Sequence, residues 1–475
     1  MNTKLLKQKI LDLAIRGKLT DQRKSDGTAA DLLKQISEQK RESSSTLSSP
    51  RRRGSPSAQS EKTIIPLDKN EAPFEVPANW EWVRLGDVVL NRDAERKPVS
   101  KKDRNLHAQK IYDYYGAAGA IDKVEEYLFD EKLLLIGEDG ANLLSRSKPN
   151  AFLANGKYWV NNHAHVIDAI DKSMLDYLAF YINAISLDDF VTGTAQPKLN
   201  QENLNKIPIP LPPLAEQQRV VAKIEEAFAE IDAIEKNKEL LKTHIKQTRQ
   251  KILDLAIHGK LVPQNNSDEP ASVLLERITR DNPHYEKLTD IPFEIPESWE
   301  WVNAEDLFNI RSAIRIHQTD WQKEGIPFFR GRELVQLCKT GNVDFEIYIS
   351  EKLYEENKRK GGVPQKNDIL VSAVGTLGFA YVVKGNKPFY YKDAYILCFE
   401  NRHNLNPFYF QHLIHSKFIN KIIYGGSKGT TVDQLTIENA KKLPMPLPPL
   451  AEQKRIVNKI EEIFASLDEI SLHLV

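Results

Sequence analysis

The chain is poor in cysteine, and this limits the kinds of protein it can be. Only Cys338 and Cys398 occur among its 475 residues. Two thiols with apolar neighbours build neither a disulfide framework nor a cysteine-based metal cluster, so we expect both to be small buried hydrophobic residues. A long chain without disulfides is typical of the cytoplasm, and we expect the protein to act there.

Long apolar runs and net charge are also missing. No apolar stretch reaches the length of a membrane span, and Met1–Lys7 lacks the apolar core of a signal peptide. Lysine plus arginine and aspartate plus glutamate both number 66, so the formal net charge is zero. A neutral chain can bind nucleic acid through charges clustered on one face, but bulk positive charge does not drive that binding.

Sequence signatures of catalysis are absent as well. Gly425–Thr431 has the wrong residue order for a G-x-x-x-x-G-K-[ST] phosphate loop. No histidine and cysteine spacing resembles a zinc site, and there is no G-x-S-x-G elbow. Asn406–Tyr409 (NPFY) is close to the Asn-Pro-Pro-aromatic signature of amino-group DNA methyltransferases but lacks its second proline. We therefore expect a binding scaffold without catalytic residues, metal or cofactor of its own.

What the chain has instead is a long internal repeat. Three blocks of sequence occur twice: Lys7–Leu19 and Arg249–Leu261, Pro73–Val83 and Pro292–Val302, and Leu211–Ala229 and Leu447–Ala465. A repeat of this size indicates two similar units related by an approximate two-fold axis. The paired blocks lie 242, 219 and 236 residues apart, respectively, so segments of unequal length separate them. Divergent segments in a common frame indicate two different specificities on one scaffold.

The change of offset from 242 to 219 also locates an insertion in the first unit. It places about 23 extra residues between the first two blocks, where Glu42–Ser60 is rich in serine, proline and arginine. Because this segment has almost no apolar side chains, it cannot offset the entropy cost of ordering. The sequence therefore predicts a mobile linker.

The central copy of the repeat predicts one long amphipathic helix over Leu214–Ile257, about 65 Å in length. Pro212 and Pro213 suit its start, and Gly259 suits the position just past its end. Its apolar residues recur at steps of three, four and seven: Val220, Val221, Ile224, Phe228, Ile231, Ile234, Leu241, Ile245, Ile252 and Leu255.

The second copy of this helix is divided between the two ends of the chain. By the offsets of the repeat, Val475 corresponds to position 239 of the central copy, and Met1 corresponds to position 243. The segments 448–475 and 1–20 together therefore match almost the whole central helix. We infer that the chain ends meet and form a discontinuous antiparallel partner for it.

The segments between the helices have the pattern of mixed, strand-rich domains. Short apolar or aromatic runs, such as Leu133–Ile136 and Asp368–Val371, alternate with turns rich in glycine, asparagine and aspartate. Helices are expected at Leu175–Ile185 and Pro407–Ile414. The predicted fold class is α+β: two strand-rich domains, 73–211 and 292–447, joined by two long antiparallel helices in a pseudo-two-fold repeat with one helix split between the termini.

A glycine-rich polar loop is predicted after the helix in each domain. These loops are Thr192–Lys198 and Gly425–Thr431, which occupy corresponding places in the two units. Small residues with short donors allow a close approach to phosphates or base edges, although an ordinary surface turn has the same composition. The candidate DNA-binding residues are Gln196, Lys198, Lys428, Thr430, Thr431, Arg330 and Arg332.

Other candidate residues have two open interpretations. Arg330 and Arg332, and the cluster of basic and amide residues in 104–110, suit base reading by arginine, but they also suit a solvated charged edge. Trp80 and Trp82, repeated as Trp299 and Trp301, suit stacking platforms or a seal between the first strand and the core.

The combination of repeated blocks resembles the DNA specificity subunit of type I restriction-modification enzymes. The WEWV segments, the LPPLAEQ helix starts and the split KILDLAI-GKL helix carry this resemblance, which covers nearly the whole chain. It implies two target-recognition domains that each read one half of a bipartite, asymmetric DNA target. It also implies that the two long helices set the spacer between the half-sites.

The resemblance further implies the partners of the chain. Two modification subunits would carry S-adenosylmethionine and methylate adenine at N6, and restriction/translocase subunits would use ATP and Mg²⁺. Glu225, Glu226 and Glu230, with Glu461 and Glu462, would be solvated or would contact a partner. The specificity chain of a related two-subunit enzyme that cuts on both sides of its site, and an interaction scaffold that does not bind DNA, are the alternatives.

Overall fold

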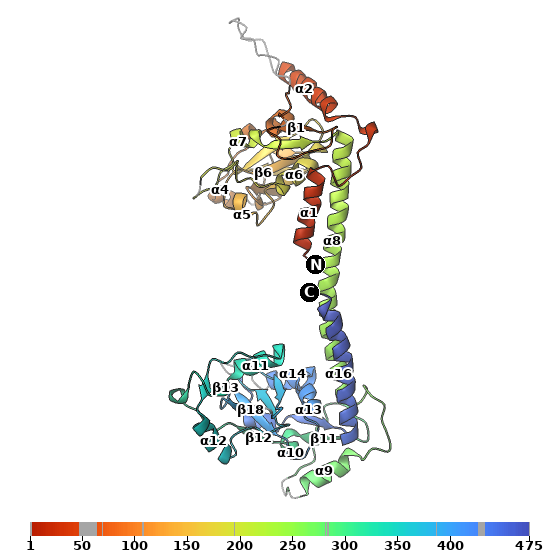
Figure 1. The fold of residues 1–475 in the computed structure, drawn as a ribbon, viewed down its shortest axis with the longest axis vertical. Coiled ribbons are helices and arrows are strands. Elements are labelled where there is room, and N and C mark those ends of the chain that lie inside the picture. Colours follow the sequence, from red (N-terminus) through yellow and green to blue (C-terminus); the bar gives the residue numbers. More distant parts are fainter. Residues whose placement is uncertain are drawn as a thin grey trace. The chain divides into compact units, whose positions relative to one another are not determined.

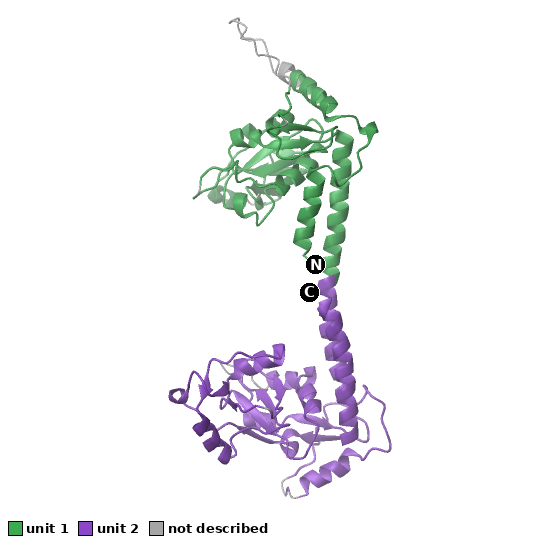
Figure 2. Cartoon of the chain, viewed as in Figure 1, with its two compact units in different colours: residues 1–237 green, residues 238–475 purple. Residues whose placement is uncertain are grey.

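The computed structural model describes residues 2–46, 64–68, 70–106, 109–193, 195–280, 282, 285–385, 387–425 and 433–474. The chain divides into two compact units, residues 1–237 and 238–475 (Figure 2). The boundary lies within one continuous helix, α8 (Leu214–Ile257), so each unit holds one part of it. Among the described residues, no helix is both long enough and apolar enough to cross a membrane.

In unit 1, the N-terminal helix α1 (Thr3–Ile15) lies against the first part of α8 (Figure 1). Lys7 forms an ion pair with Asp232, and the Thr3 hydroxyl donates a hydrogen bond to Glu235. Positions on α8 fall as positions on α1 rise, so the two helices are antiparallel.

In unit 2, the C-terminal helix α16 (Leu450–Leu472) lies against the second part of α8 (Figure 1). Arg249 of α8 pairs with Asp468 at 2.5 Å, and its guanidinium lies 4.5 Å from the ring centre of Phe464. Gln264, just past the end of α8, bonds to Glu452 in the first turn of α16, so this pair is also antiparallel. The predicted central helix and its two partners at the chain ends are confirmed, each within its own unit.

The apolar stripe of α8 is only partly buried. Val220, Ile224 and Ile231 are buried in unit 1, and Ile245 and Ile252 are buried in unit 2. Two other residues of the apolar stripe are exposed: Ile234 is 49% exposed and Leu241 is 39% exposed. They lie where the paired stretches end, since α1 begins opposite Glu235 and α16 ends at Leu472.

Each unit holds a small sheet that joins its domain to a helix start, and a larger antiparallel sheet. The small sheets are β1–β10 and β11–β19, and the four-stranded sheets have the orders β2-β9-β6-β7 and β12-β18-β15-β16. The bounds are β1 Glu81–Arg84, β2 Leu90–Asn91, β6 Leu133–Gly137, β7 Ala151–Ala154, β9 Ala164–Asp168, β10 Pro208–Leu211, β11 Glu300–Asn303, β12 Asn309–Ser312, β15 Ile369–Ser372, β16 Ala380–Val382, β18 Ile396–Glu400 and β19 Pro444–Leu447.

A further sheet in each unit is built around one parallel strand pair. In unit 1 its order is β4-β3-β8-β5, and in unit 2 it is β14-β13-β17, with β3–β8 and β13–β17 parallel. The bounds are β3 Tyr112–Gly116, β4 Gly119–Val124, β5 Phe129–Asp130, β8 Lys157–Val160, β13 Ile326–Phe329, β14 Tyr348–Ile349 and β17 Tyr390–Tyr391. The matching strand orders confirm the internal repeat and the α+β class.

Helices cover these sheets and complete the cores. In unit 1, α6 packs on β6 and β7, and in unit 2, α13 packs on β16 and α16. The predicted helix 175–185 is observed as Met174–Ala184, and the predicted helix Pro407–Ile414 is confirmed. The other helices are α3 Leu85–Val88, α4 Lys101–Leu106, α5 Asn142–Ser145, α6 Met174–Ala184, α7 Gln201–Lys206, α10 Ala304–Leu307, α11 Gly331–Thr340, α12 Glu351–Arg359, α13 Pro407–Ile414, α14 Lys417–Gly425 and α15 Ile437–Lys441.

Two corrections to the sequence analysis concern helices outside the repeated long pair. The predicted linker began at Glu42, but α2 (Ala29–Thr46) continues past it, because Leu32, Leu33 and Ile36 anchor that helix in the core. The remainder of the predicted linker, 47–60, lies outside the described residues. The second unit has a matching helix, α9 (Ala271–Thr279), with Leu274 and Leu275 buried.

The other correction concerns the glycine-rich loop of unit 2. The sequence predicted the loop after α13. A further helix that was not predicted, α14 (Lys417–Gly425), follows α13, with Ile419 and Ile423 buried. Gly425, the predicted first residue of the loop, is the last residue of this helix. The prediction that both cysteines are buried is confirmed for Cys398, whereas Cys338 is only half-buried.

Candidate nucleic-acid interface

The three repeated blocks meet at one buried joint in unit 1, where the domain is attached to the helices. Trp80 precedes β1, Gln22 follows α1, and Glu216 lies in the first turn of α8. The Trp80 indole N–H donates to Oε2 of Glu216 at 2.9 Å, and the Gln22 amide donates to Oε1 at 2.5 Å. Asn79 at 3.3 Å and Thr20 at 3.5 Å complete the donors around this fully buried carboxylate.

A glycine makes the close packing of this joint possible. Gly17 lies two residues past the end of α1 with φ +65°, and a Cβ there would lie 2.4 Å from Cγ of Pro77 and 3.2 Å from the Trp80 ring. The position therefore needs glycine both for its left-handed backbone and for the lack of a side chain. An ion pair of 2.6 Å between Arg219 and Asp26 lies beside it and ties α8 to the segment after α1.

Unit 2 builds the same joint from the second copies. Trp299 donates to Glu452 at 2.9 Å, and Gln264 donates to the same carboxylate at 2.5 Å. Gly259 has φ +66°, with Cγ of Pro296 2.3 Å from a Cβ built there. Blocks with three different sequence offsets thus converge on one geometry twice, which accounts for their repetition. Of the two interpretations of the tryptophans, the packing one is confirmed, because Trp80, Trp82, Trp299 and Trp301 are all buried.

The two joints differ in the number of side chains that donate hydrogen bonds to the central carboxylate. In unit 2 the equivalents of Thr20 and Asn79 are Val262 and Ser298, and the Ser298 hydroxyl donates to Gln264 instead. Among the described residues, Trp299 and Gln264 are the side chains that donate to Glu452. Burial raises the pKa of the Glu452 carboxyl above its usual value, against the opposing effect of these hydrogen bonds.

Away from the joint, residues 197–198 of the predicted unit 1 loop, and residues 433–434 just past the predicted unit 2 loop, lie beside the turn that follows an inner strand of each large sheet. In unit 1 a short bridge pairs Lys198 with Asp139, just after β6, and the Gly140 amide donates to the Pro197 carbonyl. In unit 2 Gln434 pairs with Val374, just after β15, and the Gly375 amide donates to the Asp433 carbonyl. By the 236-residue offset of the repeat, Asp433 and Gln434 correspond to Pro197 and Lys198, so these positions are equivalent in the two units. Residues 426–431 of the predicted unit 2 loop lie outside the described residues.

An ion-pair network holds the loop of unit 1. Arg96 pairs with Glu138 at 2.6 Å and with Asp93 at 3.3 Å, and Lys198 pairs with Glu138 at 3.2 Å. Buried His165 contacts Asp93 at 2.6 Å through Nδ1 and the Leu199 carbonyl at 2.8 Å through Nε2. Asp93, Glu138 and His165 lie close enough to hold a metal ion, but these contacts already engage them, so we interpret the group as a support for the loop.

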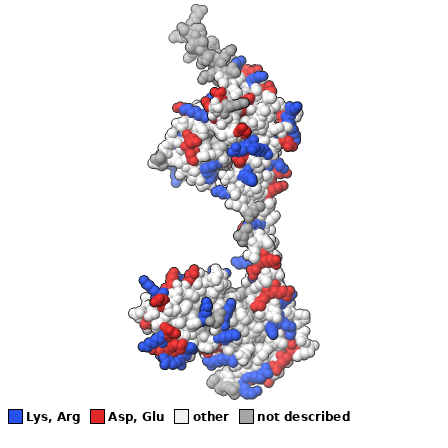
Figure 3. All heavy atoms as spheres, in the orientation of Figure 1, with Lys and Arg blue, Asp and Glu red and all other residues white. Residues whose placement is uncertain are grey.

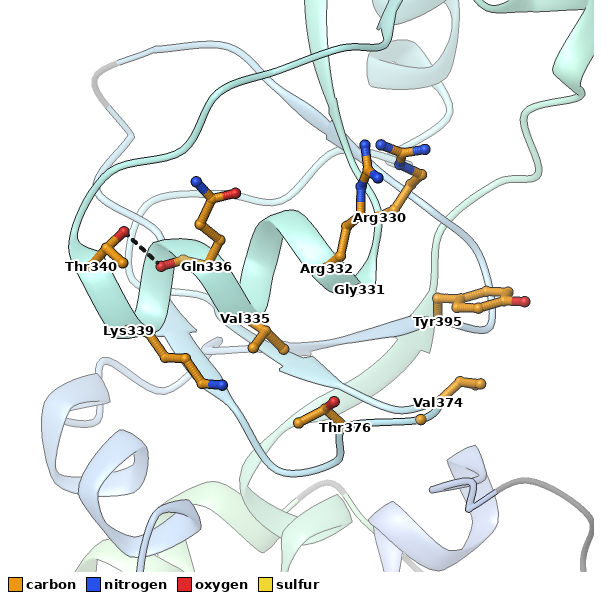
Figure 4. A pocket seen from close by; sticks show the side chains of 11 residues that line it. Arg330, Gly331, Arg332, Val335, Gln336, Lys339, Thr340, Val374, Thr376 and Tyr395 are labelled. Atoms are coloured by element: carbon orange, nitrogen blue, oxygen red, sulfur yellow. Dashed lines mark hydrogen bonds between the residues drawn. The ribbon is translucent and has the colours of Figure 1, made fainter. Parts of the chain in front are cut away.

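In unit 2 a hollow of about 630 Å³ lies next to the equivalent turn. Helix α11 forms one side of it, where Arg332, Val335, Gln336 and Lys339 share one helical face. Val335 and Lys339 extend from α11 toward Thr376 in the turn after β15, and Tyr395 lies at another side of the hollow (Figure 4). Arg332, Gln336, Lys339 and Thr376 are exposed, so their donors are accessible from solvent.

The predicted DNA-binding residues fall into three groups. Gln196 and Lys198 are exposed on the unit 1 loop. Arg330 and Arg332 both line the unit 2 hollow, where Arg332 is more exposed, with 57% of its side chain accessible against 21% for Arg330. Both arginines pair with buried Glu333. The third group, Lys428, Thr430 and Thr431, lies outside the described residues.

Sequence reasoning missed the other polar residues of the unit 2 hollow. Gln336 and Lys339 belong to a helix that was not predicted, because its polar face hid the short apolar stripe of Leu334 and Leu337. The spacing of Arg332, Gln336 and Lys339 was the available signal. On the visible face of each unit, basic side chains are interspersed with acidic ones, in agreement with the neutral composition (Figure 3).

Comparison with known proteins identifies the family to which this architecture belongs. A family model described as type I restriction modification DNA specificity domain matches residues 77–243 and 296–472. The chain belongs to this family. Each match covers one strand-rich domain and helix residues that follow it, so the specificity subunit carries two copies of the DNA specificity domain.

Individual relatives of this specificity subunit span most of its length. It is 29% identical to S.HindORF215P of Haemophilus influenzae, with 82% of this chain and 89% of the relative covered. It is 25% identical to the EcoAI specificity subunit of Escherichia coli, with 98% and 90% covered. Among solved structures, the HsdS subunit of Thermoanaerobacter tengcongensis is 20% identical, with 85% and 94% covered and a TM-score of 0.46.

Proposed function

We propose that each unit of this specificity subunit reads one half of an asymmetric, two-part target in double-stranded DNA. The observation that carries the proposal is the double family match, because one DNA specificity domain lies in each unit. Different secondary structure in the two domains supports unequal half-sites. Helices α8, α1 and α16 would then hold the readers at a set spacing and present surfaces for partner subunits.

The chemistry of the complex would reside on those partners. Two modification subunits would bind S-adenosylmethionine and methylate adenine at N6, and restriction/translocase subunits would use ATP and Mg²⁺. The whole complex would act on DNA in the cytoplasm. The engagement of Asp93 and His165 in structural contacts supports a chain that binds without catalysing.

For unit 2, we assign the reading surface to the hollow beside α11. An exposed helix face fits the major groove, where glutamine can bond the edge of adenine and lysine or arginine the edge of guanine. Gln336, Lys339 and Arg332 present such donors along one face of the helix. In unit 1 the segment between β3 and β6 has no helix among its described residues and forms the β4 hairpin strand and β5, so its reading surface has a different shape.

The direct test is a genome-wide map of methylated adenines in cells with and without this gene. We expect a two-part, non-palindromic motif that vanishes when the gene is deleted and returns when it is restored. Purified specificity subunit alone should show no methylation, nuclease or ATPase activity.

Either of two results would overturn the proposal. One is an unchanged methylation map after deletion of the gene, in cells that express the modification subunits. The other is binding of S-adenosylmethionine by the isolated chain, which would place chemistry in the wrong subunit.

A further inference from the structure

We propose that the two buried Trp–Glu joints are specificity determinants, because they fix the spacer length that the complex accepts. The joints are Trp80–Glu216 with Gln22 and Gly17, and their copies in unit 2. This inference rests on the proposed function. It assigns control of the spacer to the attachment of each domain as well as to the helices.

The joint ties the domain and both helices of a unit together at one carboxylate, in addition to the packing of α6 on α1 in unit 1 and of α13 on α16 in unit 2. Within unit 1, Glu216 belongs to α8, Trp80 leads into the domain strand β1, and Gln22 follows α1. Strand β1 pairs with β10, and only Pro212 and Pro213 separate β10 from α8. A rotation of the domain about its helix would therefore have to break the bonds to Glu216.

The size of a domain shows why a small rotation at the joint matters. A domain of this length has a radius of about 20 Å, so a tilt of about 10° about a joint at its edge moves the centre of the domain by about 3.5 Å. That is close to the rise of one base pair, since about 10 base pairs span about 34 Å. Only a joint stiff to within a few degrees keeps a spacer to a single length.

The bonding of the joint supplies that stiffness. A buried carboxylate that accepts from an indole and an amide at 2.9 and 2.5 Å makes short, charge-assisted hydrogen bonds, which have narrow geometric preferences. Pro77 and Trp80 pack so closely against Gly17 that no side chain fits at that position. The same distances recur in unit 2 although the domains differ, so the joint is independent of what each domain reads.

The test uses the full complex of this chain with its modification subunits and reads spacer length from the methylated-adenine map. The variants Trp80→Phe and Trp299→Phe each remove one indole donor while keeping an aromatic ring. We expect methylation of sites whose spacer differs by one base pair to rise about tenfold over wild type, with both half-sites unchanged. Glu216→Gln, which keeps an acceptor but removes the charge, should give a smaller broadening.

Trp82→Phe is the matched control. Trp82 lies two residues further on, within β1, and is also buried, but its indole donates to the Phe74 carbonyl at 3.1 Å and not to a helix. It should lower stability without changing the spacer. An unchanged spacer in both joint variants, or equal broadening in Trp82→Phe, would overturn the inference. A wild-type map without a two-part motif would overturn the proposed function instead.

Discussion

The two units share their attachment to the helices but differ in the segment that would meet DNA. Between β3 and β6, unit 1 has the hairpin strand β4 and the short strand β5, whereas between β13 and β15 unit 2 has α11, β14 and α12. The joints, in contrast, agree to within 0.1 Å in their shortest hydrogen bonds, since both indole bonds are 2.9 Å and both amide bonds are 2.5 Å. Repeated sequence therefore marks how a reader is held, and divergent sequence marks what it reads.

The largest expected effect is the loss of stability caused by adding a methyl group at either joint. Gly17→Ala and Gly259→Ala force a Cβ to within 2.4 and 2.3 Å of a proline ring, on backbone with positive φ. We expect each to destabilise its own unit by about 3 kcal/mol or more, from overpacking and backbone strain together.

Chemical denaturation of the full chain measures this effect. Gly156→Ala and Gly341→Ala serve as controls, because these glycines have φ +76° and +72° with open space around them, so they carry strain alone. They should cost about 1 kcal/mol. Equal losses at the joint and control glycines would show that close packing at the joint has no role.

The second prediction separates the two joints from each other. Trp299→Phe leaves Glu452 with Gln264 as its side-chain donor among the described residues, whereas Trp80→Phe leaves Glu216 with three. We expect losses of about 2 kcal/mol in unit 2 and about 1 kcal/mol in unit 1. Hydrogen exchange of the amides in each helix start reports the two units separately. If Trp80→Phe lost more stability than Trp299→Phe, the number of remaining donors would not explain the difference between the joints.

The third prediction concerns the reading surfaces. Gln336→Ala should relax one base position in one half-site by about tenfold, and Lys339→Ala should weaken all sequences or relax one position, depending on whether it contacts phosphate or base. The half-site read by unit 1 is the internal control and should stay unchanged. If methylation of all sites is unaffected in both variants, α11 does not contact DNA.

The smallest effect is a pH dependence of stability that arises from Glu452 in unit 2. The pKa of Glu452 is raised in the folded chain, so the buried carboxylate costs stability above that pKa, and protonation removes the cost. As the pH falls from neutrality through the raised pKa toward the usual value, wild type should gain stability relative to Glu452→Gln. Glu461→Gln, at an exposed position on the same helix, is the control for denaturation at each pH. A stability difference that does not change across this window would contradict the assignment.

The sequence predicted the scaffold well because the scaffold is built from local rules that occur twice. Prolines at positions 212 and 213, glycine at 259 and the apolar steps between them predict helix α8 with its observed bounds. Repetition then identified its partners at the two chain ends, which no single helix pattern would show.

The joint and the reading surfaces were harder to predict, for two physical reasons. Glu216 and Glu452 look like ordinary solvated acids in a helix, and only the fold reveals the indole that each accepts from. Helix α11 is short and its Gln336 and Lys339 carry no sequence signature of DNA contact. The sequence suggested Arg330 as a DNA-binding residue, but in the structure its guanidinium forms an ion pair with Glu333 at the rim of the hollow.

The most direct test of two readers held on one continuous helix is to insert four residues into α8 between Asn237 and Lys242, at the boundary of the units. The insertion adds about 6 Å of helix. A map of methylated adenines should then show both half-sites unchanged and a spacer altered by about two base pairs. An active complex that keeps its original spacer would contradict the account.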